Sequence, residues 1–323
     1  MKILVTGGAG FIGSHFLDFL TKESGFDGEI RVLDALTYAG RMENIENLIS
    51  AGKVNFTRGS IFDINVLDQV MPGIDVVFNF AAESHVDRSI GNSSSFVITN
   101  VLGTQALLDS ARKYGVDKYI QVSTDEVYGS LDEGSWDEFS PLSPNSPYSA
   151  TKASADLLCL AYYKTFGLDL RITRCSNNYG PRQFPEKLIP LFATNLMKGQ
   201  KVPLYGNGLN SRDWLYVKDH CAAIWAIMKN GTAGNVYNIG GGAEKTNLEI
   251  SQVILEHFGF GEEMIEFVPD RLGHDFRYSV DFSKVSKLGY KPKYGFESSI
   301  HDTLEWYKNN QQWWKPLAGI SGR

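Results

Sequence analysis

Short apolar runs alternate with longer amphipathic stretches along the first half of the chain. The apolar runs predict strands at 2–6, 30–33, 54–58, 75–80, 118–123 and 168–173. The stretches between these runs include helical patterns at 12–22, 96–113 and 148–166. Continuous apolar runs are typical of strands buried on both faces, so the alternation predicts an α/β fold with a doubly wound, Rossmann-like parallel sheet.

A glycine-rich turn follows the first predicted strand and opens the first predicted helix. Gly7, Gly10 and Gly13 have the spacing G-x-x-G-x-x-G, which differs by one residue from the dinucleotide-binding pattern G-x-G-x-x-G. Glycines here allow a tight turn and bring the backbone close to a pyrophosphate at a helix N-terminus. The second strand is followed by Asp34, about 20 residues after the last glycine, where an acid bonds a ribose 2′-hydroxyl and repels a 2′-phosphate. The pattern predicts NAD rather than NADP; the alternative is an acid that caps a helix after an unrelated turn.

Beyond about residue 175 the sequence changes to shorter elements separated by many Pro and Gly residues. We therefore expect residues 1–176 to form the NAD-binding domain, with segments near 212–240 returning to it. Residues 177–323 are expected to form mainly a smaller substrate-binding lobe.

Composition and charge narrow the function class. The chain has 323 residues and a net charge of −6, with Lys and Arg scattered, which argues against nucleic-acid binding. No apolar run approaches the ~20 residues of a membrane span, and the first strand begins almost at residue 1, so we expect a cytoplasmic protein. The cysteines Cys159, Cys175 and Cys221 are widely spaced and predict free thiols. The histidines show no metal-ligand spacing, so no metal is predicted.

A Tyr and a Lys lie four residues apart at the start of the third predicted helix. Tyr148 and Lys152 therefore share a helix face. A phenol with a pKa near 10 is a poor base at neutral pH, but a nearby ammonium favours the phenolate. Tyr148 is thus a candidate for exchanging a proton with a substrate alcohol. The alternative is an ordinary surface Tyr and Lys on an amphipathic helix.

Two neighbouring carboxylates, Asp125 and Glu126, follow the predicted strand 118–123. Loss of water needs an acid for the departing hydroxyl and a base for the C–H proton, and adjacent carboxyls disfavour double ionisation. Successive residues of a strand point to opposite faces. Both side chains can face one substrate only if the chain curls at the strand end, which we predict. The alternative is that the pair caps the next element.

Several separated motifs together resemble the extended short-chain dehydrogenase/reductase family. They are the glycine turn, Ser123-Thr124 and Tyr148-x-x-x-Lys152. Within this family the chain resembles the branch that dehydrates dTDP-glucose, over nearly its whole length. That resemblance rests on the segments 33–40, 81–89, 123–129, 177–181, 185–190 and 270–275.

The resemblance implies a reaction on dTDP-glucose with NAD as cofactor. The sugar is oxidised at C4, loses water across C5 and C6, and is reduced at C6, which regenerates NAD. Tyr148 would remove the 4-hydroxyl proton, Glu126 the C5 proton, and Asp125 would protonate the departing C6 hydroxyl. Thr124 would bond the 4-hydroxyl and Lys152 the nicotinamide ribose. The alternatives are a UDP-sugar 4-epimerase, which needs no acid–base pair at 125–126, a dehydratase of another nucleotide sugar, and a non-catalytic NAD-binding module.

The resemblance also implies the binding residues. Those for the cofactor are Gly7, Gly10, Phe11, Ile12, Gly13, Asp34, Leu36, Thr37, Tyr38, Gly40, Ser60, Ile61, Ala81, Ala82, Ser84, Thr99, Ser123, Tyr148, Lys152 and Asn178. Those for the substrate are Ser84, Thr124, Asp125, Glu126, Tyr148, Asn177, Lys187, Leu188, Pro203, Tyr205, Arg212, Asn247, Arg271, His274 and Tyr278.

Some further implications concern single positions and assembly. Arg212 and Arg271 suit a diphosphate, since guanidinium binds phosphate oxygens bidentately. Ser60 stands where the family has an Asp that bonds adenine, so a charge-assisted contact is lost. His85 and His220 are expected to be structural. A homodimer is implied, through a four-helix interface formed by the helices near 96–113 and 148–166.

Overall fold

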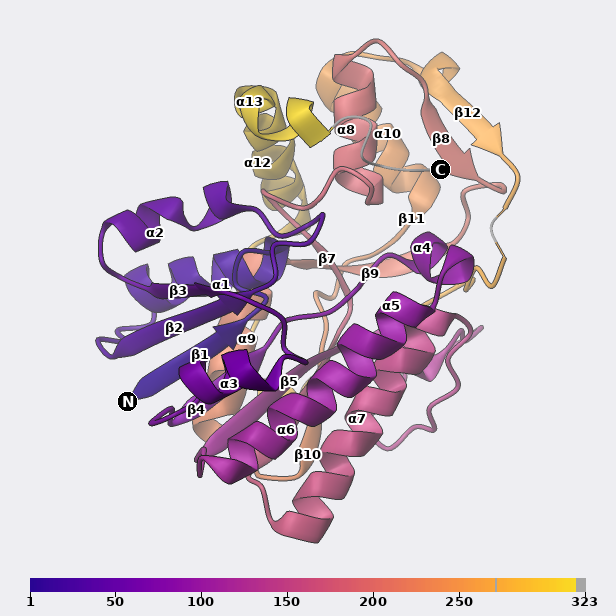
Figure 1. Ribbon diagram of the computed structural model, residues 1–323. Helices are drawn as coiled ribbons and strands as arrows, with labels where there is room; N and C mark the ends of the chain where they lie inside the picture. The colour runs from indigo at the N-terminus through magenta and orange to yellow at the C-terminus, as the bar shows by residue number, and fades with distance from the viewer. Residues whose placement is uncertain (271, 318–323) are drawn as a thin grey trace.

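A seven-stranded parallel sheet forms the centre of the computed structural model, which describes residues 1–270 and 272–317 (Figure 1). Its strand order is β10-β6-β5-β4-β1-β2-β3, and every neighbouring pair is parallel. The strands are β1 (Lys2–Thr6), β2 (Glu29–Asp34), β3 (Asn55–Arg58), β4 (Val76–Asn79), β5 (Lys118–Thr124), β6 (Leu170–Cys175) and β10 (Asn235–Ile239). The predicted doubly wound parallel sheet is confirmed, and all six predicted strands are present.

Helices cover both faces of this sheet. On one face, Ile3 and Val5 of β1 pack with Phe16 in a single buried cluster. On the other face, Leu4 and Leu107 belong to a second cluster. Alternate side chains of β1 therefore enter two cores, which explains the run Ile3-Leu4-Val5 in this strand.

The helices that form the two layers come mainly from the crossovers between strands. The first face carries α1 (Phe11–Lys22), α2 (Glu46–Ser50) and α9 (Val217–Asn230). The second carries α3 (Ile64–Val70), α6 (Gly103–Lys113) and α7 (Pro147–Phe166). The short helices α4 (Val86–Gly91) and α5 (Ser94–Phe96) precede α6.

The helix predicted at 96–113 is not uniform. A π-helical segment, Val97–Leu102, joins α5 to α6. The extra residue in each turn rotates the side chains by comparison with an α-helix. Thr99 lines the cavity described below, while Asn100 is buried. Asn100 Oδ1 accepts a hydrogen bond from Glu83 N at 2.9 Å, and its Nδ2 donates one to Glu83 O at 3.0 Å.

Helix α7 begins and ends where its sequence contains clear signals. The Ser146 hydroxyl accepts a hydrogen bond from Ser149 N, and Pro147 occupies the first turn. The helix ends at Gly167, whose φ of 71° is in the left-handed region that glycine favours. These signals fix the position of Tyr148 in the first turn.

The C-terminal half adds two small sheets and a helical layer, seen at the upper right of Figure 1. A three-stranded sheet has the order β11-β9-β7, and β12 pairs with β8. Their strands are β7 (Asn177–Tyr179), β8 (Val202–Tyr205), β9 (Ser211–Tyr216), β11 (Glu244–Thr246) and β12 (Ile265–Val268). The helices of this layer are α8 (Leu188–Met197), α10 (Asn247–Phe258), α12 (Phe296–Asn309) and α13 (Gln311–Trp314), while α11 (Ser283–Ser286) packs against β10 of the central sheet.

Within the described ranges, none of the helices combines the length and the hydropathy that crossing a membrane requires. The cysteines Cys159, Cys175 and Cys221 are buried free thiols, as predicted.

Candidate active site

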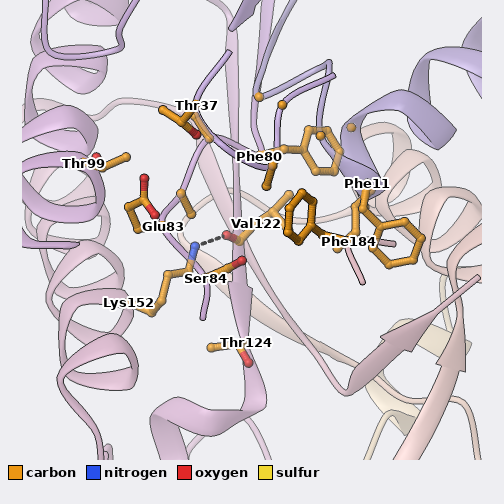
Figure 2. Close-up of a pocket in the computed structure, with 18 of the residues that line it drawn as sticks. Phe11, Thr37, Phe80, Glu83, Ser84, Thr99, Val122, Thr124, Lys152 and Phe184 are labelled. Carbon is orange, nitrogen blue, oxygen red and sulfur yellow. Dashed lines mark hydrogen bonds between the residues drawn. The ribbon is translucent and has the colours of Figure 1, made fainter. Parts of the chain in front are cut away.

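A cavity of about 480 Å³ lies beyond the carboxyl ends of the central strands (Figure 2). Gly7 follows β1, Asp34 ends β2, Ala81 lies just after β4, Thr124 ends β5 and Cys175 ends β6, and all of them line the cavity. β1 pairs with β2 on one side and with β4 on the other. The cavity therefore lies at the topological switch point, where the strand order reverses. This is where open α/β sheets bind ligands.

The structure brings most of the predicted residues to this cavity. Those lining it are Gly7, Gly10, Phe11, Ile12, Gly13, Asp34, Thr37, Gly40, Ser60, Ile61, Ala81, Ala82, Ser84, Thr99, Ser123, Thr124, Asp125, Glu126, Tyr148, Lys152, Asn177, Asn178 and Lys187. Predicted residues that do not line it are Leu36, Tyr38, Leu188, Pro203, Tyr205, Arg212, Asn247, His274 and Tyr278. Arg271 lies outside the described residues.

The glycine turn leaves no room for side chains. Gly7 has φ of 69°, and a Cβ on it would lie 2.6 Å from Ala81 N. A Cβ on Gly13 would lie 2.2 Å from Gly7 O. Gly10 is the N-cap of α1, whose first turn has neither a side-chain cap nor an acidic residue. Backbone N–H groups at this helix start are therefore available to an anionic group in the cavity.

Asp34 is held at the rim by backbone donors. Its Oδ2 accepts from Ala9 N at 2.9 Å and its Oδ1 from Leu36 N at 2.8 Å. Burial raises the pKa of Asp34, and these two hydrogen bonds oppose that shift. A carboxylate accepts about four hydrogen bonds, so each oxygen can still accept one from a hydroxyl. The geometry suits the predicted contact with a ribose.

Lys152 points from α7 toward the end of β5, as Figure 2 shows. Its Nζ donates to the carbonyl oxygen of Val122 at 2.6 Å, and burial lowers its pKa. Tyr148 is buried, and its pKa is raised well above the usual range by that burial first and then by the neighbouring carboxyl group of Glu126. The effect of Lys152 on the Tyr148 phenolate stays a prediction.

The carboxylate pair occupies a sharp turn. A 3₁₀-helix, Asp125–Tyr128, begins directly after β5, and the Thr124 hydroxyl accepts from Glu126 N at 3.3 Å. The predicted curl at the strand end is confirmed, and it brings both acidic side chains to the cavity. Asp125 is 2% exposed, whereas Glu126 is half-buried and accepts a hydrogen bond from Ser149 Oγ at 3.2 Å.

The two carboxyl groups differ electrostatically. Burial, followed by the neighbouring carboxyls of Glu126 and Asp213, raises the pKa of Asp125 well above its usual range. Arg212 opposes this shift. Asp125 Oδ2 is buried and has no hydrogen-bond partner among the described residues, which is the environment of a protonated carboxyl group.

Arg212 and Tyr278 adjoin the carboxylate pair although they do not line the cavity. The Arg212 guanidinium lies 4.4 Å from the centre of the Tyr278 ring and donates to the carbonyl oxygen of Asp275 at 2.8 Å. The Tyr278 hydroxyl bonds the Asp275 carboxylate. Glu126 contributes to raising the pKa of Tyr278, so this group lies within electrostatic reach of the pair.

The remaining predicted substrate residues form a separate group near β8. The rings of Tyr205 and His274 meet edge to face with centroids 6.0 Å apart. His274 Nδ1 lies 2.5 Å from Asp270 Oδ1. Asn247 opens α10, where its backbone N–H donates to Asn210 O at 2.9 Å.

Several cavity residues were not predicted. They are Leu33, Ala35, Ala39, Gly59, Phe62, Phe80, Glu83, Val122, Cys175, Ser176, Gln183, Phe184 and Glu186. Glu83 and Glu186 carry charge and are adjacent in sequence to predicted residues, a signal that could have identified them. Figure 2 draws Glu83 among the side chains that line the cavity.

Glu186 accepts hydrogen bonds from two segments that lie far from it in the sequence. Its Oε1 accepts from the Tyr38 hydroxyl at 2.7 Å and its Oε2 from Arg88 Nε at 3.0 Å. The Arg88 guanidinium also lies 3.8 Å from the centre of the Tyr38 ring. Lys187 Nζ donates to Ser84 O at 2.8 Å. Tyr38 thus supports the cavity from behind rather than lining it.

The two histidines expected to be structural have ordinary structural partners. His220 is buried, and its Nδ1 lies 2.8 Å from Asn178 Oδ1. His85 caps α4, where its Nδ1 accepts from Arg88 N at 3.4 Å.

Comparison with known proteins agrees with this geometry. The family model described as GDP-mannose 4,6 dehydratase matches residues 4–303. A dTDP-glucose 4,6-dehydratase of Streptomyces niveus is 52% identical over 321 residues, which cover 98% of this chain and 96% of the relative.

Solved structures show the same fold. The dTDP-glucose 4,6-dehydratase DesIV of Streptomyces venezuelae, solved with NAD and TYD bound, aligns with a TM-score of 0.97 at 50% identity, covering 98% of this chain and all of DesIV. A UDP-glucose 4-epimerase of Thermus thermophilus, in complex with NAD, aligns with a TM-score of 0.87 at 32% identity, covering 96% and 100%. The fold is thus shared by dehydratases and epimerases, while sequence identity is higher toward the dehydratase. A match that spans almost the whole chain, on a parallel sheet with this cavity at its rim, makes the chain a member of the GDP-mannose 4,6 dehydratase family.

Proposed function

We propose that this protein is an NAD-dependent dTDP-glucose 4,6-dehydratase, which converts dTDP-glucose to dTDP-4-keto-6-deoxyglucose and water. The observation that carries this assignment is the turn at Asp125–Tyr128, which places two carboxyl groups of different character in one cavity with Tyr148. Oxidation and reduction at C4 alone would not need such a pair.

The cavity residues fit NAD as the cofactor. The glycine turn admits no Cβ, the start of α1 is uncapped, and Asp34 is placed for a ribose hydroxyl. NAD, when bound, accepts a hydride from C4 of the sugar and returns it at C6. The negative charge of Asp34 disfavours a 2′-phosphate, which supports NAD over NADP.

Tyr148 and Thr124 act at the sugar 4-hydroxyl. Tyr148 acts as the base in its phenolate form, which a nearby ammonium such as that of Lys152 favours. The phenolate takes the proton of the 4-hydroxyl as C4 becomes a ketone. The Thr124 hydroxyl, at the cap of the turn, orients the same group.

The 4-ketone acidifies the proton at C5, and the carboxyl pair then completes the elimination. Glu126 is the more exposed partner and takes the C5 proton. Asp125 holds its proton because of burial and the neighbouring carboxyls, and it protonates the departing C6 hydroxyl. One carboxyl group thus accepts the C5 proton, and the other donates the proton with which the C6 hydroxyl leaves as water.

The second half of the chain supplies the nucleotide contacts. Lys187 at the start of α8 lines the cavity, and Arg212 and Tyr278 adjoin the carboxylate pair. We propose that these residues, with Asn247, Tyr205 and His274, bind the nucleotide and diphosphate. The guanidinium of Arg212 suits phosphate oxygens. Residues 177–323 would then form mainly the substrate lobe, and residues 1–176 the NAD-binding domain, to which β10 returns beside β6.

The test is direct incubation with nucleotide sugars. With dTDP-glucose, the protein is expected to give the alkali-developed absorbance of a 4-keto-6-deoxy product and a mass lower by one water. Product with UDP-glucose but none with dTDP-glucose would overturn the substrate assignment and retain the mechanism. Formation of dTDP-galactose without loss of water would identify an epimerase.

We also propose a homodimer. Its interface would be formed by α7 and by the helical segment that runs from α5 through Val97–Leu102 to α6. Exposed apolar side chains lie on these neighbouring helices at Val97, Ile98, Leu102, Leu157 and Phe166. Light scattering on the purified protein tests this, with Leu157→Asp expected to give a monomer. A wild-type monomer would contradict the proposal. The cytoplasmic location stays a prediction.

A further inference from the structure

Two helices of the C-terminal half bring three metal-ligating side chains together, away from the cavity. His257 lies in the last turn of α10, while His301 and Glu305 are one turn apart on α12. One ligand atom from each residue lies within 4.8 Å of the others. The spacing of histidines along the sequence gives no sign of this cluster, because His257 and His301 meet only through helix packing.

The most buried member of this cluster faces a carboxylate. The side chain of His257 is 10% exposed, and its Nε2 lies 3.2 Å from Glu305 Oε1. Nε2 is buried, and this contact does not have the geometry of a well-aligned hydrogen bond. Buried polar atoms nearly always have a well-aligned partner, so an imidazole nitrogen that faces a carboxylate in this way is placed to share a cation with it. The ring itself is held by Phe258 and His301, with centroids 4.9 and 5.0 Å away.

We propose that His257, His301 and Glu305 bind a divalent transition-metal ion of the Zn²⁺ type, with solvent completing the coordination. Two imidazole nitrogens and one carboxylate oxygen form a ligand set that Zn²⁺ uses in proteins. Tetrahedral ligands about 2.0–2.2 Å from the metal are separated by roughly 3.3–3.6 Å. The separation of His257 Nε2 from Glu305 Oε1 is already close to this value.

The other side chains can close the remaining distance. His301 is exposed on α12, so its ring can rotate toward the metal. A bound ion would join the end of α10 to α12 and stabilise the fold by mass action.

Substitution of Lys308 is expected to change the metal affinity in the opposite direction to substitution of a ligand. Its Nζ lies 3.0 Å from Glu305 Oε1 in an exposed ion pair, so it competes with a metal for the same oxygen. Exposed pairs of this kind are weak and can be displaced. Removing the Lys308 charge is expected to tighten metal binding, whereas removing the Glu305 charge is expected to weaken it.

Isothermal titration of the full-length, tag-free, chelator-treated protein with ZnCl₂ tests the proposal. We expect one saturable site per chain with micromolar affinity and a higher melting temperature. His301→Ala and Glu305→Gln should each weaken binding at least about tenfold, and Lys308→Gln should strengthen it. The matched control Glu297→Gln, which removes an exposed acid from the same helix, should bind as the wild type.

Three results would overturn the proposal. One is the lack of saturable binding up to millimolar ZnCl₂. Another is equal affinity of His301→Ala and the wild type, which would place any bound zinc elsewhere, for example on a thiol. A third is equal weakening by Glu297→Gln and Glu305→Gln, which would indicate a diffuse charge effect. Because His301 is exposed and Glu305 only half-buried, these variants keep the core packing, and circular dichroism checks their folding.

Discussion

Asp125 and Glu126 are consecutive in the chain and both line the cavity, yet one carboxyl group is almost fully buried while the other is half-buried and accepts a hydrogen bond. Asp125 Oδ2 has no hydrogen-bond partner among the described residues, whereas Glu126 Oε2 accepts from Ser149 at 3.2 Å. The 3₁₀ turn that begins at Asp125 produces this difference. Two adjacent acids therefore acquire the separate characters that an acid and a base require.

Asp125→Asn should separate catalysis from stability. The amide cannot supply the proton for the departing hydroxyl, so dehydration of dTDP-glucose should fall about 10²–10⁴-fold. The pKa of Asp125 is raised by burial and by nearby carboxyls, so folding disfavours its charged form. The wild type should therefore lose stability as the pH rises above the ordinary pKa of Asp. The neutral Asn side chain avoids this penalty, so the loss should be smaller in Asp125→Asn.

Turnover and urea denaturation at pH 5 and pH 8 measure both effects of Asp125→Asn. Asp132→Asn, an exposed acid in the following loop, is the control and should change neither. Wild-type turnover in Asp125→Asn would remove this residue from the acid role.

Tyr148→Phe and Glu126→Gln should stop the reaction at different points. Without the phenol, no group takes the proton of the 4-hydroxyl, so no 4-keto sugar should form. Without the Glu126 carboxylate, oxidation at C4 remains possible but the C5 proton is retained. Acid quench and mass spectrometry should therefore find a 4-keto sugar that still contains its 6-hydroxyl only in Glu126→Gln, in an amount comparable to the enzyme. Rapid dehydration by Glu126→Gln would rule out its role as base.

Ser60→Asp should strengthen NAD binding. Ser60 lines the cavity at the end of β3, and its Oγ accepts only a long hydrogen bond from Phe62 N, at 3.5 Å. A carboxylate there would restore the charge-assisted contact to adenine that the family resemblance implies. Such hydrogen bonds are worth about 1.5–3 kcal/mol, so the dissociation constant should fall roughly tenfold or more.

Calorimetric titration with NAD measures this change. Asn55→Asp adds the same charge at an exposed position at the other end of β3 and should leave affinity unchanged. Weaker binding by Ser60→Asp would show that the adenine site is built differently in this chain.

The parts of the structure that local chemistry determines could be predicted from the sequence. Runs rich in apolar residues identified β1, β2, β4, β5 and β6 because side chains of these strands are buried on both faces of the sheet. The glycine turn and Asp34 were recognisable because steric limits and charge act within a few residues. The turn at Asp125 followed from the requirement that two adjacent carboxylates reach one substrate.

Features that depend on packing between distant segments could not be predicted. The π-helical segment looks like an ordinary helix in the sequence, because its apolar period is close to that of an α-helix. The hydrogen bonds that Glu186 accepts from Tyr38 and Arg88 join segments far apart in the sequence, so these partners could not be predicted. Lys152 was expected to act on the phenol, but only the fold places the Val122 carbonyl oxygen at its ammonium.

Two buried histidines should make the protein less stable as the pH falls below neutrality. Burial lowers the pKa of both His15 and His220 from 6.5 to about 3. Between these values the unfolded chain binds a proton on each ring and the folded protein does not, so stability is complete above about pH 6.5 and is lost as the pH falls toward 3. At pH 5.5 the loss should be about 1.4 kcal/mol for each histidine. Urea denaturation with a chelator present should show a pH dependence smaller by about that amount in His220→Asn than in the wild type. An unchanged slope in both His220→Asn and His15→Gln would mean that neither ring is kept neutral by the fold.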